Sequence, residues 1–140
     1  MATVGNYNMP DELFYHKEHM WVKIDGNIAR VGVDDFTQKM AGEASFLDLP
    51  AEGDTVKADD RVGTIETGKW LGKLFAPVSG KIAKKNGTVE DDATLVNKDP
   101  YGQGWLFEIE MSDPAEVSKL VQGEAAKQWL EAEIVKHAPK

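Results

Sequence analysis

Short runs of alternating apolar and polar residues occupy most of the chain between Trp21 and position 110, and this pattern predicts a protein made mainly of β-strands. The dipeptide Asp25-Gly26, which type I′ hairpin turns prefer, lies between two such runs and predicts a β-hairpin. Further along, turn residues separate the runs repeatedly: Pro50 to Asp54, Gly68-Lys69, Pro77, Ser79-Gly80, Asn86-Gly87 and Pro100 to Gly102. Strands this short and closely spaced indicate a sandwich or a flattened barrel.

A weak internal repeat is compatible with two paired sheets. With a period of 33 residues, the segment from Leu49 to Val62 matches the segment from Ile82 to Leu95 at five positions. Two units are too few for a solenoid, so the repeat favours a pseudo-symmetric pair of small sheets.

The pattern after Asp34 predicts a short helix, since Asp34 can cap it, Phe36 and Met40 share one face, and Gly42 can end it. The region of about 113–138 carries the pattern of two further helices. The first has Asp113 as its N-cap, followed by Pro114 and Glu116, and closes at Gly123. The second places four apolar side chains on one side: Ala126, Trp129, Leu130 and Ile134.

Composition places the chain among ordinary folded single-domain proteins and argues against several classes of function. Its 140 residues, 41% of them hydrophobic, suit one domain, 1–140, with a lead-in at 1–13 and no linker. The net charge of −8 argues against nucleic-acid and anionic-membrane partners. No cysteine is present, which excludes disulfides and thiolate sites. The start of the sequence has no secretory or transit pattern, so we expect a cytoplasmic protein.

The histidines do not suggest a metal site. His16 and His19 are three residues apart, and His137 lies far along the chain, but no Glu or Cys set completes a ligand group. We expect structural or solvated roles for them. Trp105, which follows two glycines, is expected to pack in the core or to cover it.

The segment Thr67-Gly68-Lys69-Trp70 lies between two strand-like runs and predicts a second hairpin. A glycine at the first central position is typical of a type II′ turn, which puts Gly68 and Lys69 at the apex. A lysine at an apex is exposed and unhindered. In an arbitrary hairpin it is simply solvated, so this pattern alone does not establish a function.

The segment ETGKWLGKLFAPVSGKI resembles the lipoylation site of the glycine cleavage system H-protein family. The resemblance extends from about residue 15 to about residue 130 through KEHMWV, GVDDF, FLDLPAEGD, APVSG, LVNKDPYGQGWLFEIE and SDPAEV, in the order and spacing of that family. It implies a mainly β fold with peripheral α-helices, lipoyl-domain-like (a barrel-sandwich hybrid or hammerhead), built of two small antiparallel sheets.

The same resemblance implies a function. The protein would be a carrier and not an enzyme, with lipoic acid attached covalently to Lys69 as N6-lipoyllysine. Glu66, three residues earlier, is acidic as in the family, and Glu66, Gly68 and Trp70 become candidates for recognition by lipoylating or partner enzymes. A solvated carboxylate on an edge strand is an equal alternative for Glu66. A lipoate ligase or lipoyltransferase would load the arm, and a monomer would suit a shuttle. No metal is implied.

The residues around the lysine differ from the usual glycine cleavage pattern, in which small residues follow the lysine. Here Trp70 and Leu71 follow it. A Gly-Lys-Trp-apolar-Gly site is similar to the lipoate-binding proteins of sulfur oxidation, whose partner is a heterodisulfide-reductase-like complex. We therefore favour a carrier of sulfur intermediates. The alternative is a glycine cleavage carrier of the aminomethyl group, with glycine decarboxylase, aminomethyltransferase and dihydrolipoamide dehydrogenase as partners.

Two other readings use the same exposed lysine differently. Biotin carriers share the hairpin design, but they flank the lysine with methionines, and the neighbours here are Gly68 and Trp70. An unmodified interaction domain is the other possibility. The intact mass of the purified protein distinguishes these readings.

Overall fold

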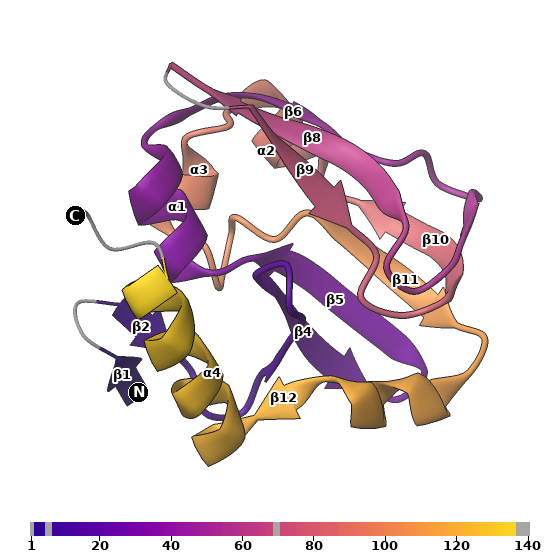
Figure 1. The fold of residues 1–140 in the computed structure, drawn as a ribbon. Helices are drawn as coiled ribbons and strands as arrows, with labels where there is room; N and C mark the ends of the chain where they lie inside the picture. The colour runs from indigo at the N-terminus through magenta and orange to yellow at the C-terminus, as the bar shows by residue number, and fades with distance from the viewer. Residues whose placement is uncertain (1, 5–6, 69–70, 137–140) are drawn as a thin grey trace.

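The computed structural model describes residues 2–4, 7–68 and 71–136, whose strands form three antiparallel sheets with short helices around them (Figure 1). The strands are β1 (Ala2–Val4), β2 (Tyr7–Met9), β3 (Phe14–Tyr15), β4 (Met20–Asp25), β5 (Ile28–Val33), β6 (Ala44–Asp48), β7 (Thr55–Val56), β8 (Arg61–Thr67), β9 (Leu71–Phe75), β10 (Gly80–Lys85), β11 (Phe107–Met111) and β12 (Val121–Gln122). The helices are α1 (Asp35–Ala41), α2 (Gly87–Asp91), α3 (Leu95–Lys98), the 3-10 helix η1 (Pro114–Lys119) and α4 (Gly123–Lys136).

Two sheets of unequal size enclose the main core. One has the order β12-β3-β4-β5-β11-β10-β7, the other the order β6-β8-β9, and β1-β2 is a separate hairpin. Figure 1 shows the three-stranded sheet lying over the larger one, with α1 and α3 beside its end. The main core cluster contains Val22 and Ile109 from the larger sheet and Leu47, Ile65 and Leu74 from the smaller. The predicted mainly β fold with peripheral helices is confirmed, and neither sheet order closes into a barrel within the described residues.

The first predicted hairpin is present, but its turn is one residue later than expected. Asp25 pairs with Ile28, so Gly26 and Asn27 are the central residues. Gly26 has a φ of 61°, and Asn27 is not among the residues with positive φ. A type I′ turn needs positive φ at both central positions, so the predicted turn type was wrong. The pairing of β4 with β5 decides where the turn lies. If this pairing shifted by one residue, the buried Val22 would point outward.

Helix α1 begins and ends as the sequence predicted. The side chain of Asp34 accepts a hydrogen bond from the Thr37 N–H, and Gly42 ends the helix with a φ of 87°. Phe36 is buried on the core side of the helix, whereas Met40 is exposed.

The internal repeat does not correspond to repeated structure. Thr55 and Val56 form β7, whereas their counterparts Thr88 and Val89 lie in helix α2. Asn86 is not part of a hairpin turn, since its side chain caps α2 by accepting a hydrogen bond from the Thr88 N–H. A strong N-cap residue therefore outweighed the turn preference of Asn-Gly.

The C-terminal region differs from its prediction in the first of its two helices. Residues Pro114–Lys119 form a 3-10 helix, and β12 separates it from α4. Glu116 does not complete a capping box, because its carboxylate accepts hydrogen bonds from the N–H and the hydroxyl of Ser79. Gly123 begins α4 with a φ of 62° instead of ending the preceding helix.

Helix α4 packs as predicted, on a second and smaller core cluster. Ala126 and Leu130 are buried there, and Trp129 and Ile134 are partly buried against the same cluster. Met9 and Tyr15 from the start of the chain belong to the same cluster. A search of the described helices found none with the length and hydropathy of a membrane span.

Candidate functional site

The β8–β9 hairpin carries the residues that the sequence analysis singled out. Glu66 pairs with Leu71, so positions 67–70 join these two residues at the end of the hairpin. Lys69 and Trp70 lie outside the described residues. Glu66 and Gly68 are exposed.

Gly68 does not have the conformation that was predicted for it. Its φ is outside the left-handed region that a type II′ turn requires at this position, so that turn type was wrong. A Cβ atom built on Gly68 would meet no heavy atom within 4 Å. The space around Gly68 is therefore open.

The base of the hairpin is fixed by close packing. Ile65 and Leu74 are fully buried, and they bring both strands onto the main core. At Gly63 a Cβ atom would lie 2.1 Å from the Asp48 carbonyl oxygen, so only glycine allows β8 to approach β6 this closely. A rigid base and an open end suit a site of covalent attachment, since a group added at the end leaves the core unchanged.

A cleft of about 670 Å³ lies beside β9, between the hairpin, helix α1 and the end of α4. Its apolar lining consists of Met20, Val33, Phe36, Met40, Ala41, Ile65, Leu71 and Phe75. Its charged and titratable lining consists of Lys17, Glu18, His19, Lys73, Glu133 and Lys136. The cleft therefore combines an apolar surface with charges of both signs, directly next to the hairpin.

His19 forms one wall of this cleft and joins two distant parts of the chain. Its ring nitrogens lie 2.8 Å from an Asp34 oxygen and 2.9 Å from a Glu133 oxygen. The ring also stacks on Phe36, with centroids 4.8 Å apart, and contacts Trp129 at 4.7 Å. Burial by itself lowers the pKa of His19, but the hydrogen bonds and charges of Asp34 and Glu133 outweigh burial and raise it above 6.5.

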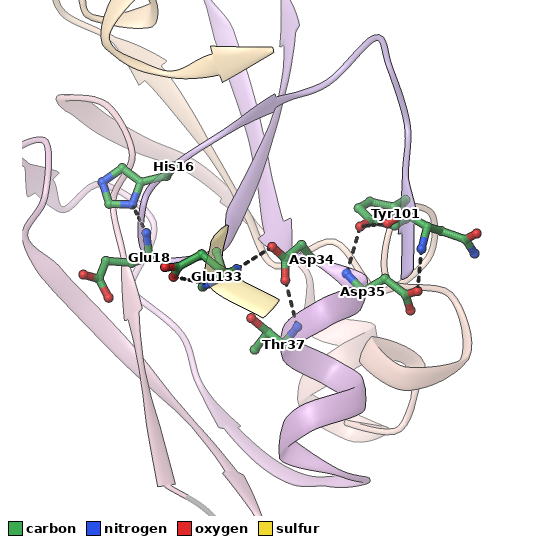
Figure 2. Close-up of polar contacts among 9 residues, drawn as sticks. His16, Glu18, Asp34, Asp35, Thr37, Tyr101 and Glu133 are labelled. Atoms are coloured by element: carbon green, nitrogen blue, oxygen red, sulfur yellow. Dashed lines mark hydrogen bonds and ion pairs between the residues drawn. The ribbon is translucent and has the colours of Figure 1, made fainter. Parts of the chain in front are cut away.

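The carboxylates behind His19 hold helix α1 in position (Figure 2). Asp34 is buried, and it contacts His19 while capping the helix through Thr37. Asp35 accepts a hydrogen bond from the Asn8 N–H at 2.8 Å. The Tyr101 hydroxyl accepts from the Asp35 N–H and donates to the Asn8 carbonyl, at 2.8 and 2.7 Å. Burial raises the pKa of Tyr101, so this hydroxyl keeps its proton at any physiological pH.

His137 lies outside the described residues, and the two other candidates, His16 and Trp105, make structural contacts. His16 is buried, and its Nε2 lies 2.5 Å from an Asp59 oxygen. That hydrogen bond lowers the pKa of Asp59. Trp105 is partly buried on the second cluster, with the Arg30 guanidinium 4.6 Å above its ring. Within the described ranges, no three His, Asp or Glu side chains are arranged to hold a metal ion.

Sequence reasoning missed both the cleft and the contact of His19 with Glu133. The two residues are 114 positions apart, so no local pattern brings them together. The one available signal was His19 itself, a polar residue directly before the strand run that begins at Met20.

Three comparisons with known proteins agree with one another. A sequence model of the family described as glycine cleavage H-protein matches residues 13–133. The glycine cleavage system H protein of Carboxydothermus hydrogenoformans is 43% identical over 125 residues, which are 89% of this chain and 96% of that protein. That of Bacteroides thetaiotaomicron is 41% identical, over 86% of this chain and 95% of the relative. The crystal structure of the Mycobacterium marinum H protein superimposes with a TM-score of 0.76 at 29% identity, covering 89% and 98% of the two chains.

Proposed function

Because this chain belongs to the glycine cleavage H-protein family, we propose that it is the lipoyl carrier of a glycine cleavage system, with its arm on Lys69. Proteins of this family are carriers and not enzymes, and they bear lipoic acid covalently on a lysine. The family model, the relatives and the solved structure described above are all glycine cleavage H proteins, which favours this alternative over the sulfur-oxidation reading.

The placement of the hairpin supports Lys69 as the attachment site. The paired residues next to it, from Gly63–Leu74 to Glu66–Leu71, keep one register. This is the register that a two-residue connection at positions 68 and 69 requires. The open space at Gly68 leaves room for a lipoylating enzyme to reach the neighbouring lysine.

The cleft beside β9 fits a lipoyl group, because its apolar lining suits an eight-carbon chain. When bound, the lipoyl group supplies a disulfide that takes up a substrate fragment with reduction at one enzyme and is restored at others. The protein itself attaches the arm, presents it on a rigid hairpin and offers an apolar surface beside it. We take residues 1–140 as one carrier domain, with lipoate ligase or lipoyltransferase and the glycine cleavage enzymes as its partners.

Intact mass after treatment with lipoate ligase tests the attachment site. The parent chain should gain one lipoyl increment, and a Lys69→Arg variant should gain none. Lys73→Arg is the matched control, since Lys73 is exposed on the same hairpin, and this variant should be modified like the parent. A lipoyl increment that persisted in Lys69→Arg would show that the group is attached to another residue. A biotinyl increment would show that the protein carries biotin instead of lipoic acid.

Glycine decarboxylation with the loaded protein tests the pathway. Activity that depends on Lys69 supports a glycine cleavage carrier. A second candidate, a carrier of sulfur intermediates, keeps one observation in its favour: Trp70 and Leu71 follow the lysine, where the usual glycine cleavage pattern has small residues. A folded and fully lipoylated protein that glycine decarboxylase does not use would favour that candidate.

A further inference from the structure

A β-bulge in β6 turns a large apolar side chain out to solvent. Ala44 pairs with Thr67, but the next pair is Phe46 with Glu66, so Ser45 is an additional residue in β6. Without the bulge Phe46 would share the inward face of Ala44, since side chains alternate along a strand. Instead, Ala44 and Leu47 are buried and Phe46 is 52% exposed. The Ser45 hydroxyl donates to the Glu66 carbonyl at 3.2 Å and ties the bulge to β8.

The bulge places Phe46 in one row with two residues of the lysine hairpin. Phe46 is opposite Glu66, and Glu66 is opposite Leu71, so the three side chains project from the same face of the sheet. All three are exposed. We name this row the Phe46–Glu66–Leu71 row. It crosses the sheet at the last described pair before the hairpin end.

Half of the exposed large hydrophobic residues in the described part of the chain lie on this row. The large hydrophobic residues that are exposed in the described part of the chain are Met40, Phe46, Leu71 and Val135. Two of these four flank Glu66. Leu71 is also part of the cleft lining, so the row is continuous with the cleft beside the hairpin.

We propose that the Phe46–Glu66–Leu71 row is the docking surface for glycine decarboxylase, and that this enzyme presents an apolar surface with a basic side chain for Glu66. The inference rests on the proposed function. The charge of the row supports it, because one carboxylate stands between two apolar groups on a chain with a net charge of −8.

The next row of the same face gives the docked partner a fixed orientation. Asp48 is opposite Thr64, which is opposite Lys73, so this row has a negative charge at its β6 side and a positive charge at its β9 side. A partner with the reverse arrangement fits in one orientation only. A two-fold contact centred on the Phe46–Glu66–Leu71 row would bring two Glu66 carboxylates together, which argues against a second copy of this chain as the partner.

Two measurements test the docking surface, the first on lipoylated protein and the second on protein without the lipoyl group. In the Phe46→Ala, Leu71→Ala double variant we expect the KM of glycine decarboxylase for the carrier to rise about tenfold, with kcat unchanged. The Kd for the same enzyme, measured by calorimetry with unacylated Lys69→Arg chains, should rise by a similar factor. This Kd does not depend on the lipoyl arm, because the Lys69→Arg chains carry none. Glu66→Gln should weaken the dependence of that Kd on salt.

Val135→Ala is the matched control, because Val135 is 77% exposed on α4, away from the row. It should leave KM and Kd unchanged, and urea unfolding of every variant should match the parent. A loaded parent that the decarboxylase does not use would overturn the proposed function and the partner assignment with it. A parent that is used no better than the double variant would overturn the docking surface alone, as would a parent that dimerises through Phe46 and Leu71.

Discussion

Replacing Glu133 with glutamine tests the ionic link between helix α4 and the rest of the molecule. The Glu133 carboxylate lies 2.9 Å from His19 Nε2, while Asp34 lies 2.8 Å from Nδ1. A neutral imidazole has one N–H and cannot donate to both carboxylates, so the observed arrangement requires protonated His19. Glutamine keeps an oxygen acceptor and removes only the charge. Lys136, 4.0 Å from the other Glu133 oxygen, is the further charge that faces this pair from α4.

The expected loss in the free energy of unfolding is about 1 kcal/mol at pH 6. Hydrogen bonds to charged groups contribute about 1.5–3 kcal/mol and neutral ones about 0.5–1.5 kcal/mol, and the substitution converts one kind into the other. The side chains of His19 and Glu133 are only 13% and 16% exposed, so solvent screens the pair little.

The effect has a defined pH dependence. Because folding raises the pKa of His19 above 6.5, its stabilising contribution is complete below pH 6.5 and is lost as the pH rises through the folded-state value. Above that value His19 is neutral in both states, and the cost of Glu133→Gln should disappear.

Urea unfolding at several values between pH 6 and pH 9 measures this, with the fluorescence of Trp129 as a nearby reporter. Glu131→Gln, an exposed position on the same helix, is the control and should change the free energy of unfolding by less than about 0.5 kcal/mol at every pH. A loss from Glu133→Gln that is constant with pH, or that grows toward pH 9, would refute the link through charged His19.

Other substitutions have equally definite outcomes. Gly80→Ala should lower the free energy of unfolding in urea by more than about 2 kcal/mol, because a Cβ would lie 2.0 Å from the Glu110 carbonyl oxygen and the φ of Gly80 is 155°. Gly87→Ala is the control and should cost far less, since the space around Gly87 is open. Equal losses in the two variants would contradict this reasoning. Glu116→Ala should lower stability by about 1–2 kcal/mol by removing both hydrogen bonds to Ser79, a loss that thermal unfolding would detect and that an unchanged Tm would disprove. Tyr101→Phe should cost about 1–3 kcal/mol, since its hydroxyl joins Asn8 to the start of α1, and hydrogen exchange at the Asp35 amide should rise unless this contact is dispensable.

Local signals in the sequence predicted the elements whose ends are determined by neighbouring residues. Helix α1 is the clearest case, because Asp34 and Gly42 lie within one short segment and act on the helix directly. The position of the lysine hairpin was predictable for the same reason, since strand runs lie on both sides of it.

Features decided by distant residues were not predictable in this way. Ser79 binds Glu116 across 37 positions and draws it away from a capping box. The bulge at Ser45 could not be predicted either. The sequence Ala44-Ser45-Phe46-Leu47 does not itself mark an extra residue, and only the pairing of β6 with β8 shows it. The family resemblance suggested the carrier role, but the atypical residues after Lys69 led the pathway prediction toward sulfur oxidation. The family match over residues 13–133 and a relative aligned over 89% of the chain favour glycine cleavage.

The two hydrophobic clusters differ in when they can form during synthesis. The buried members of the main cluster run from Met20 to Met111, so all of them have been made before α4 exists. The smaller cluster needs Met9 and Leu130 together, and closing so long a loop carries the larger entropic cost. We expect the hairpin to be assembled first and the chain ends to join last. The β8–β9 hairpin would then keep its shape while helix α4 opens locally.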